Sequence, residues 1–170
     1  MHLSRVTYLS VLILAVLWCA AIGAAPLFVS WSGAWLPAGE FLYRFFHPIC
    51  HQLGEKSPHL FGGPLAVCTR CSAIYIGFLC GVLVFPIAHR RIRWSSRTIL
   101  GVALLPMVVD VTCGILGLHE ATGLTRMITG GFFGALVPLV VLPVLMDAVL
   151  EIVSPSPVQP QKGSSNATAQ

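Results

Sequence analysis

The chain has 170 residues, of which 56% are apolar and 9% charged. An average soluble domain has about 25% charged residues, so these charges are too few to cover a water-soluble globule. The mean hydropathy of +0.84 indicates lipid as the surrounding solvent. The net charge of +4 does not indicate nucleic-acid binding, because the basic residues are not interleaved with aromatic ones. Composition therefore predicts an integral protein of the lipid bilayer and no nucleic-acid partner.

Four apolar stretches approach or exceed the roughly 20 residues that a helix needs to cross a bilayer. They predict spanning helices over about 6–29, 68–88, 98–118 and 127–147, within one membrane domain of residues 1–153. The first stretch also resembles a signal peptide, but it is long for one and Pro26 disfavours cleavage after the small residues before it. The expected fold is all-α, a four-helix transmembrane bundle with a long outer loop containing Cys and His between its first two helices.

The distribution of arginines predicts the orientation. Residues 89–97 hold four arginines and no acid, which places this connection on the cytoplasmic side. Both termini are then cytoplasmic, and the long loop and the 119–126 turn face outward from a multi-pass protein of the plasma membrane. The tail, residues 154–170, is rich in Pro, Ser and Gln and is predicted to be a disordered cytoplasmic tail.

Residues suited to chemistry gather in the outer loop and at the start of the second helix: His47, Cys50, His51, His59, Cys68, Arg70 and Cys71. If that helix begins near Val67, then Cys68, Cys71 and Tyr75 share one face. Both thiols would lie in its first turn, where the helix dipole favours the thiolate. A thiolate is the form that binds a metal or attacks a disulfide.

Three functions compete for these residues. In the first, Cys50, His51, Cys68 and Cys71 form a tetrahedral transition-metal site, with zinc as the expected cofactor. In the second, Cys68 and Cys71 are the redox pair of a membrane thiol-disulfide oxidoreductase. If these cysteines instead form a structural disulfide, it would only crosslink the loop. Cys50 beside His51 favours the metal, and whether the protein is an enzyme stays open. The third is a subunit of a small-solute or ion transporter around Asp110, which would require a homo-oligomer because four helices are few for a carrier.

A carboxylate inside the third predicted helix needs a partner. Asp110 costs about 2.5–3.5 kcal/mol on insertion scales, so it should face the bundle and be paired. Arg126, at the outer start of the fourth helix, is a candidate partner through its long side chain, and Glu120 in the turn is a competing candidate.

Other residues are interpreted as structural. Two glycine pairs have the four-residue spacing that lets helices approach closely, Gly77 with Gly81 and Gly130 with Gly134. Cys19, Cys80 and Cys113 are interpreted as packing residues.

Several motifs carry a family resemblance. They are His47-Pro-Ile-Cys-His-Gln52, Glu55-Lys-Ser57, Val67-Cys-Thr-Arg-Cys71, Tyr75-Ile-Gly77, Pro106 with Asp110, and Arg126-Met-Ile-Thr-Gly130 followed by Gly134. In this order they resemble the uncharacterised prokaryotic integral membrane family known as domain of unknown function 2085. The chain departs from that pattern at Gly54, Lys56, Ser72, Ala73 and Val111.

The family has no known activity, so the resemblance implies only that these scattered residues act as one site. Carried over, it points to Cys50, His51, Gln52, Glu55, Ser57, Cys68, Arg70, Cys71, Tyr75, Gly77, Asp110, Arg126, Thr129 and Gly130. We therefore expect a group of polar residues to orient the metal ligands or to face a substrate: His47, Gln52, Arg70, Tyr75, Asp110, Glu120, Arg126 and Thr129.

Overall fold

The computed structural model describes residues 2–31, 33–50, 52, 57–91, 94–117 and 122–153. In chain order the elements are α1 (His2–Trp31), η1 (Gly33–Trp35), α2 (Leu36–Phe46), β1 (His59–Leu60), β2 (Gly63–Pro64), α3 (Thr69–Arg91), α4 (Ser96–Ile115) and α5 (Gly123–Val153). Within these residues four helical stretches are long and apolar enough to span a membrane: Leu3–Trp31, Thr69–His89, Ser96–Ile115 and Gly123–Val153. The all-α, four-helix transmembrane fold is therefore confirmed.

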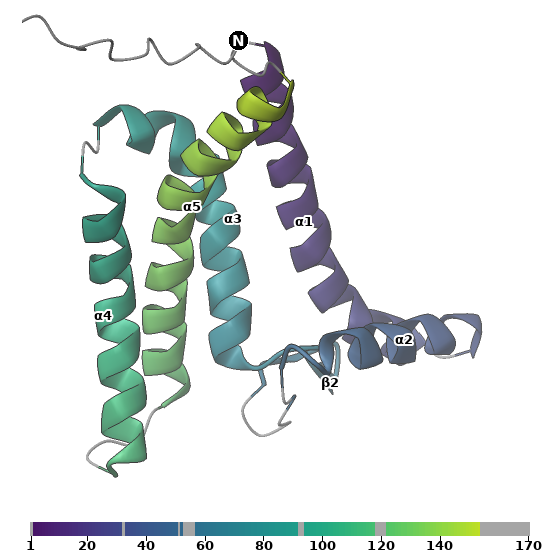
Figure 1. Cartoon of the computed structure of the whole chain (residues 1–170). Helices are drawn as coiled ribbons and strands as arrows, with labels where there is room; N and C mark the ends of the chain where they lie inside the picture. The colour runs from purple at the N-terminus through teal and green to yellow at the C-terminus, as the bar shows by residue number, and fades with distance from the viewer. Residues whose placement is uncertain are drawn as a thin grey trace, which may run out of the picture.

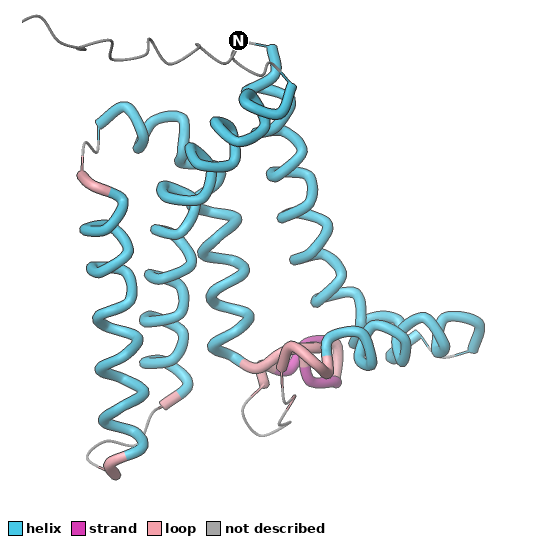
Figure 2. Tube along the Cα trace, viewed as in Figure 1, coloured by secondary structure: helices cyan, strands magenta, loops and turns pink. Residues whose placement is uncertain are grey.

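The spanning helices alternate in direction. In Figure 1, α3, α4 and α5 lie side by side, and α1 leans away from them and meets α5 near its own start. The start of α1 and the end of α5 lie at the same end of the bundle. A proline inside a helix removes a hydrogen bond and kinks it, and α1 contains Pro26. Beyond this kink the last turns of α1 run beside α2, which lies across the opposite end of the bundle (Figure 2).

The long loop between the first two spanning helices contains more secondary structure than the sequence indicated. It contains α2 and a short antiparallel hairpin in which His59 pairs with Pro64 and Leu60 with Gly63. Helix α2 carries Pro37 in its first turn, where a missing backbone N–H removes no helical hydrogen bond. An 11-residue helix is too short to span a bilayer, so the length test for spanning helices does not detect it.

Two apolar clusters hold the bundle together. One, beside α2, buries Ile22, Ala25, Phe46, Cys50, Ala66 and Val67. The other lies toward the opposite end and buries Val82, Phe85, Ile99, Leu139 and Leu142. Near this second cluster the Tyr8 hydroxyl donates to the Val82 carbonyl at 3.1 Å. That carbonyl has no helical donor because Pro86, four residues later, has no N–H, so Tyr8 satisfies it and ties α1 to α3.

The tightest contact between helices joins α3 and α5 through glycines. A Cβ built on Gly77 would lie 2.3 Å from the Gly131 carbonyl oxygen, and one on Gly81 would lie 2.3 Å from that of Ala135. From the other side, a Cβ on Gly134 would lie 2.1 Å from the Ile74 carbonyl oxygen. The two backbones therefore touch, as the four-residue glycine spacing predicts, and no side chain fits between them.

We expect Gly134→Ala to force α3 and α5 apart. The new methyl group meets backbone that cannot rotate away, so the protein should lose about 1–3 kcal/mol of stability. Thermal unfolding in mild detergent measures this as a lowered midpoint. Gly101→Ala on α4 is the matched control, because no heavy atom lies within 4 Å of the Cβ it adds. Equal midpoints for the two variants would contradict the close contact.

Candidate thiol site

Three cysteines from separate parts of the chain converge beside the start of α3. Cys50 follows α2, Cys68 directly precedes α3, and Cys71 lies in its first turn. Their Sγ atoms all lie within 4.8 Å of one another, and Cys50 is buried. A zinc ion with Zn–S bonds of about 2.3 Å holds its sulfur ligands about 4 Å apart, so small side-chain movements would bring these atoms to coordination distance. All six cysteines of the chain are free in the structure.

The thiol of Cys68 is electrostatically distinct. The backbone N–H of Cys68 donates to Cys50 Sγ at 3.2 Å. The side-chain hydrogen bond from Cys71 is the main cause that lowers the pKa of Cys68 to about 5, against burial, which raises it. The lowered pKa favours the thiolate form of Cys68 over that of its neighbours in the cluster.

A hydrogen-bonded loop holds Cys50 against α3. Gln52 adopts a left-handed backbone conformation, with φ of 48°, and its Nε2 donates to the carbonyls of Tyr43 at 2.7 Å and Ala66 at 2.8 Å. The Tyr43 hydroxyl in turn donates to the Pro64 carbonyl. Burial raises the pKa of Tyr43, so this hydroxyl keeps its proton at neutral pH. Gln52 and Tyr43 thus join the end of α2 to the segment that leads into Cys68.

The partner of Asp110 is Arg70, so the candidate pairing with Arg126 is wrong. Arg70 Nη2, from the first turn of α3, forms an ion pair with Asp110 Oδ2 on α4. The Asp110 side chain is 6% exposed and that of Arg70 is 22% exposed. Sequence order favoured Arg126 because it follows α4, but the fold brings the start of α3 to the same depth as Asp110. Arg70 Nε is also buried and has no hydrogen-bond partner within the described residues.

The remaining predicted site residues are less closely associated. His47 caps the C-terminus of α2 and is exposed. Tyr75 packs against the first apolar cluster, with its ring 5.7 Å from that of Trp18. Thr129 bonds within α5, its hydroxyl donating to the Thr125 carbonyl at 2.8 Å. Arg126 is partly buried near the start of α5.

Three predicted residues, the expected ligand His51, Glu55 and Glu120, lie outside the part of the chain that the structure describes.

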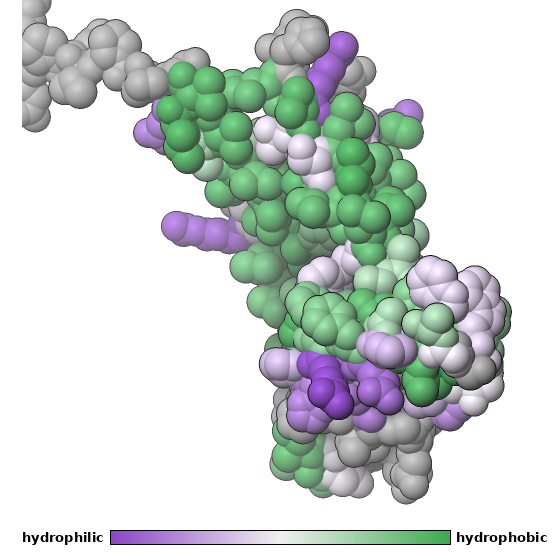
Figure 3. Space-filling view, turned by 90° about the vertical axis from the view of Figure 1, so that its right-hand side faces the viewer, coloured by the Kyte–Doolittle hydropathy of each residue, from purple (hydrophilic) through white to green (hydrophobic). Residues whose placement is uncertain are grey.

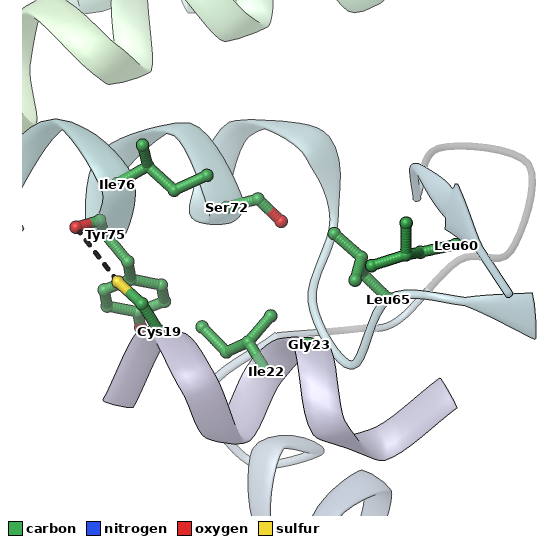
Figure 4. Close-up of a pocket in the computed structure, with 8 residues that line it drawn as sticks. All are labelled: Cys19, Ile22, Gly23, Leu60, Leu65, Ser72, Tyr75 and Ile76. Atoms are coloured by element: carbon green, nitrogen blue, oxygen red, sulfur yellow. Dashed lines mark hydrogen bonds between the residues drawn. The ribbon is translucent and has the colours of Figure 1, made fainter. Parts of the chain in front are cut away.

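Sequence reasoning did not predict a cavity beside the thiols. It has a volume of about 170 Å³ and lies between α1, α3 and the hairpin, as Figure 4 shows. Its lining is largely apolar and includes Cys19, Ile22, Leu65, Ser72 and Tyr75. Across it the Cys19 thiol donates to the Tyr75 carbonyl at 3.5 Å. Cys19 therefore links α1 to α3.

Comparison with known proteins identifies the family. The model of the family described as predicted membrane protein, domain of unknown function 2085, matches residues 50–142, which is more than half of the chain. An uncharacterised protein of Methanocaldococcus jannaschii is 34% identical over 147 residues, covering 84% of this chain and 94% of that protein. Another, of Methanothermobacter thermautotrophicus, is 32% identical over 91 residues, covering 50% of this chain and 77% of that protein.

No solved structure matches the chain. The chain belongs to this family of membrane proteins, as its motifs predict. The matched segment contains all three clustered thiols and both members of the ion pair.

Removing Arg70 should destabilise the protein strongly. Arg70→Met leaves the buried Asp110 without a counter-charge, which costs about 3–5 kcal/mol, whereas Arg70→Met combined with Asp110→Leu removes both charges and should recover most of that loss. Thermal unfolding in detergent measures both variants.

The same substitution at the cation favoured by sequence order, Arg126→Met, is the matched control and should change the midpoint little. If Arg126→Met lowers the unfolding midpoint more than Arg70→Met does, the partner of Asp110 is Arg126 and not Arg70.

Proposed function

We propose that this membrane protein binds a transition metal, zinc first, through Cys50, Cys68 and Cys71. The convergence of three Sγ atoms within 4.8 Å carries the proposal. Thiolate sulfur is a preferred ligand of zinc, and the lowered pKa of Cys68 favours the thiolate form of this residue. A bound ion would remove the repulsion between neighbouring thiolates and would join the loop after α2 to α3.

The fourth ligand that we propose is His51, from the sequence. His51 is the next residue in the chain after Cys50, which already belongs to the cluster. Three thiolates and one imidazole complete a closed tetrahedral set, which is typical of a structural zinc site. On this proposal the ion stabilises the outer loop and performs no hydrolysis.

The orientation proposed for the site follows from the arginines. Arg91 at the end of α3 and Arg97 in α4 belong to the basic connection that favours the cytoplasm. The thiols lie at the opposite end of α3, so they face the extracytoplasmic side of the plasma membrane, and both termini are cytoplasmic.

Metal content should depend on the clustered cysteines alone. Protein purified without chelator should contain about one equivalent of zinc by elemental analysis, in line with a single four-ligand site. Cys50→Ser, Cys68→Ser and Cys71→Ser should each lose it, because a serine hydroxyl stays protonated and coordinates zinc weakly. Replacing the zinc by cobalt should give thiolate-to-cobalt charge-transfer absorption that disappears in the same variants.

The chain offers matched controls for this test. Cys19→Ser, Cys80→Ser and Cys113→Ser change cysteines outside the cluster and should keep the metal. A cluster variant that keeps its metal would contradict the site. A control variant that loses metal would contradict it as well. Reduced wild-type protein that takes up neither zinc nor cobalt would overturn the proposal.

A second candidate, a thiol-disulfide oxidoreductase, is favoured by the hydrogen bond between Cys71 and Cys68 that stabilises the Cys68 thiolate. The Cys68 thiolate would attack a substrate disulfide and release one thiolate. Cys71 would then lose its proton and attack the Cys68 sulfur, leaving a Cys68–Cys71 disulfide and a second free thiol. Two electrons pass from the protein to the substrate.

Oxidised glutathione tests this candidate. The metal-free wild-type protein should lose two hydrogens and carry no adduct, as seen in its intact mass. Cys50→Ala combined with Cys71→Ser removes both neighbouring thiols and should retain one glutathione on Cys68. A wild-type protein that instead accumulates glutathione, or a variant that reacts no faster at Cys68 than at Cys80, would exclude the redox function.

A further inference from the structure

We infer that α2 is an interfacial helix that lies in the outer boundary of the bilayer, with one bilayer lipid acyl chain in the corner between α1 and α2. This inference goes beyond the metal site and does not depend on it. It concerns the arm formed by the last turns of α1, η1 and α2, which runs crosswise to the spanning helices (Figure 1).

Helix α2 has three distinct faces. Gly39 and Phe46 are buried against the rest of the protein. Glu40 and Arg44 are exposed and charged. Between these faces lies an exposed apolar one, with Phe41 65% and Phe45 47% exposed. A helix with one charged face and one exposed aromatic face is typical of the membrane–water boundary, where it lies parallel to the bilayer plane.

The exposed aromatic face turns toward a spanning helix. A groove of about 290 Å³ lies between α1 and α2, lined by Leu14, Leu17, Trp18, Ala21, Phe41 and Phe45. Leu14 is 64% and Leu17 59% exposed, and both lie well inside the apolar span of α1. The groove wall is therefore continuous with surface that contacts hydrocarbon, and its lining offers almost no polar atom to a headgroup or to water.

The charge distribution fits the same placement. In Figure 3 hydrophilic residues gather on the underside of the arm, and apolar residues cover the surface of the molecule above it. The arm also carries Trp31 and Trp35, with 58% and 52% of their surfaces exposed. Tryptophan is enriched at the level of the lipid headgroups. The arm thus has its charges toward water, its tryptophans at the boundary and its phenylalanines toward the acyl chains.

Photocrosslinking of the full chain in vesicles of phosphatidylcholine and phosphatidylglycerol tests this arrangement. The photoreactive residue p-benzoylphenylalanine replaces Phe45 in one variant and Arg44, the neighbouring residue on the charged face, in its matched control. The Phe45 variant should gain the mass of one phospholipid after irradiation, with the label on the acyl chain on fragmentation, and the Arg44 variant should show a large loss of this adduct. Leu105 on α4, which is 65% exposed within its span, is a positive control position.

Three results would overturn the inference. They are an absence of lipid adduct at Phe45 while Leu105 reacts, an equal yield at Phe45 and Arg44, and a crosslink from Phe45 to a second copy of the chain. If the Phe45 variant is not recovered in folded form, the same substitution at Phe41 gives the same test, because that side chain is more exposed.

Discussion

Backbone contact between α3 and α5 is the constraint on which the rest of this molecule depends. Gly77 and Gly134 let the two helices touch without intervening side chains, so their relative register is set by backbone atoms. Lipid tails are as apolar as leucine, so helices in a bilayer gain little from hydrophobic burial and much from close packing. The contact extends to the start of α3, where a Cβ on Gly130 would lie 2.8 Å from the Arg70 carbonyl oxygen. The turn that carries Arg70 and Cys71 is thereby held by α5.

That placement explains why a carboxylate is tolerated on α4. Asp110 is buried in a span, where an unpaired charge is costly, and Arg70 reaches it from a turn that cannot move away. The pair contributes specificity more than stability, because much of its attraction offsets the desolvation of both groups. It also fixes the depth of α4 against α3, since sliding by one turn would separate the charges by about 5.4 Å.

Local pattern was enough to predict part of this structure. Four long apolar stretches predicted the four spanning helices, and the spacing of Cys68 and Cys71 placed both thiols at the start of α3. The rest depends on contacts between distant segments. Nothing local indicates that Arg70 rather than Arg126 faces Asp110, because the depth of α4 relative to α3 depends on contacts between distant segments. Likewise Cys50 reaches the other thiols through the bonds of Gln52 to Tyr43 and Ala66, which connect residues far apart in the chain.

The three thiols are held by two different structures, and this difference bears on what they do. Cys68 and Cys71 belong to the start of α3, which the bundle fixes, whereas Cys50 follows α2 and is held by the Gln52 hydrogen bonds and by burial among apolar residues. A redox pair needs only the first two, and Cys50 would then compete with Cys71 for Cys68. A metal ion would use all three. It would join the segment after the C-terminus of α2 to the start of α3, which the bundle holds in place. The proposed metal site would therefore use the buried Cys50 beside the other two sulfur atoms, whereas thiol exchange between Cys68 and Cys71 would not require it.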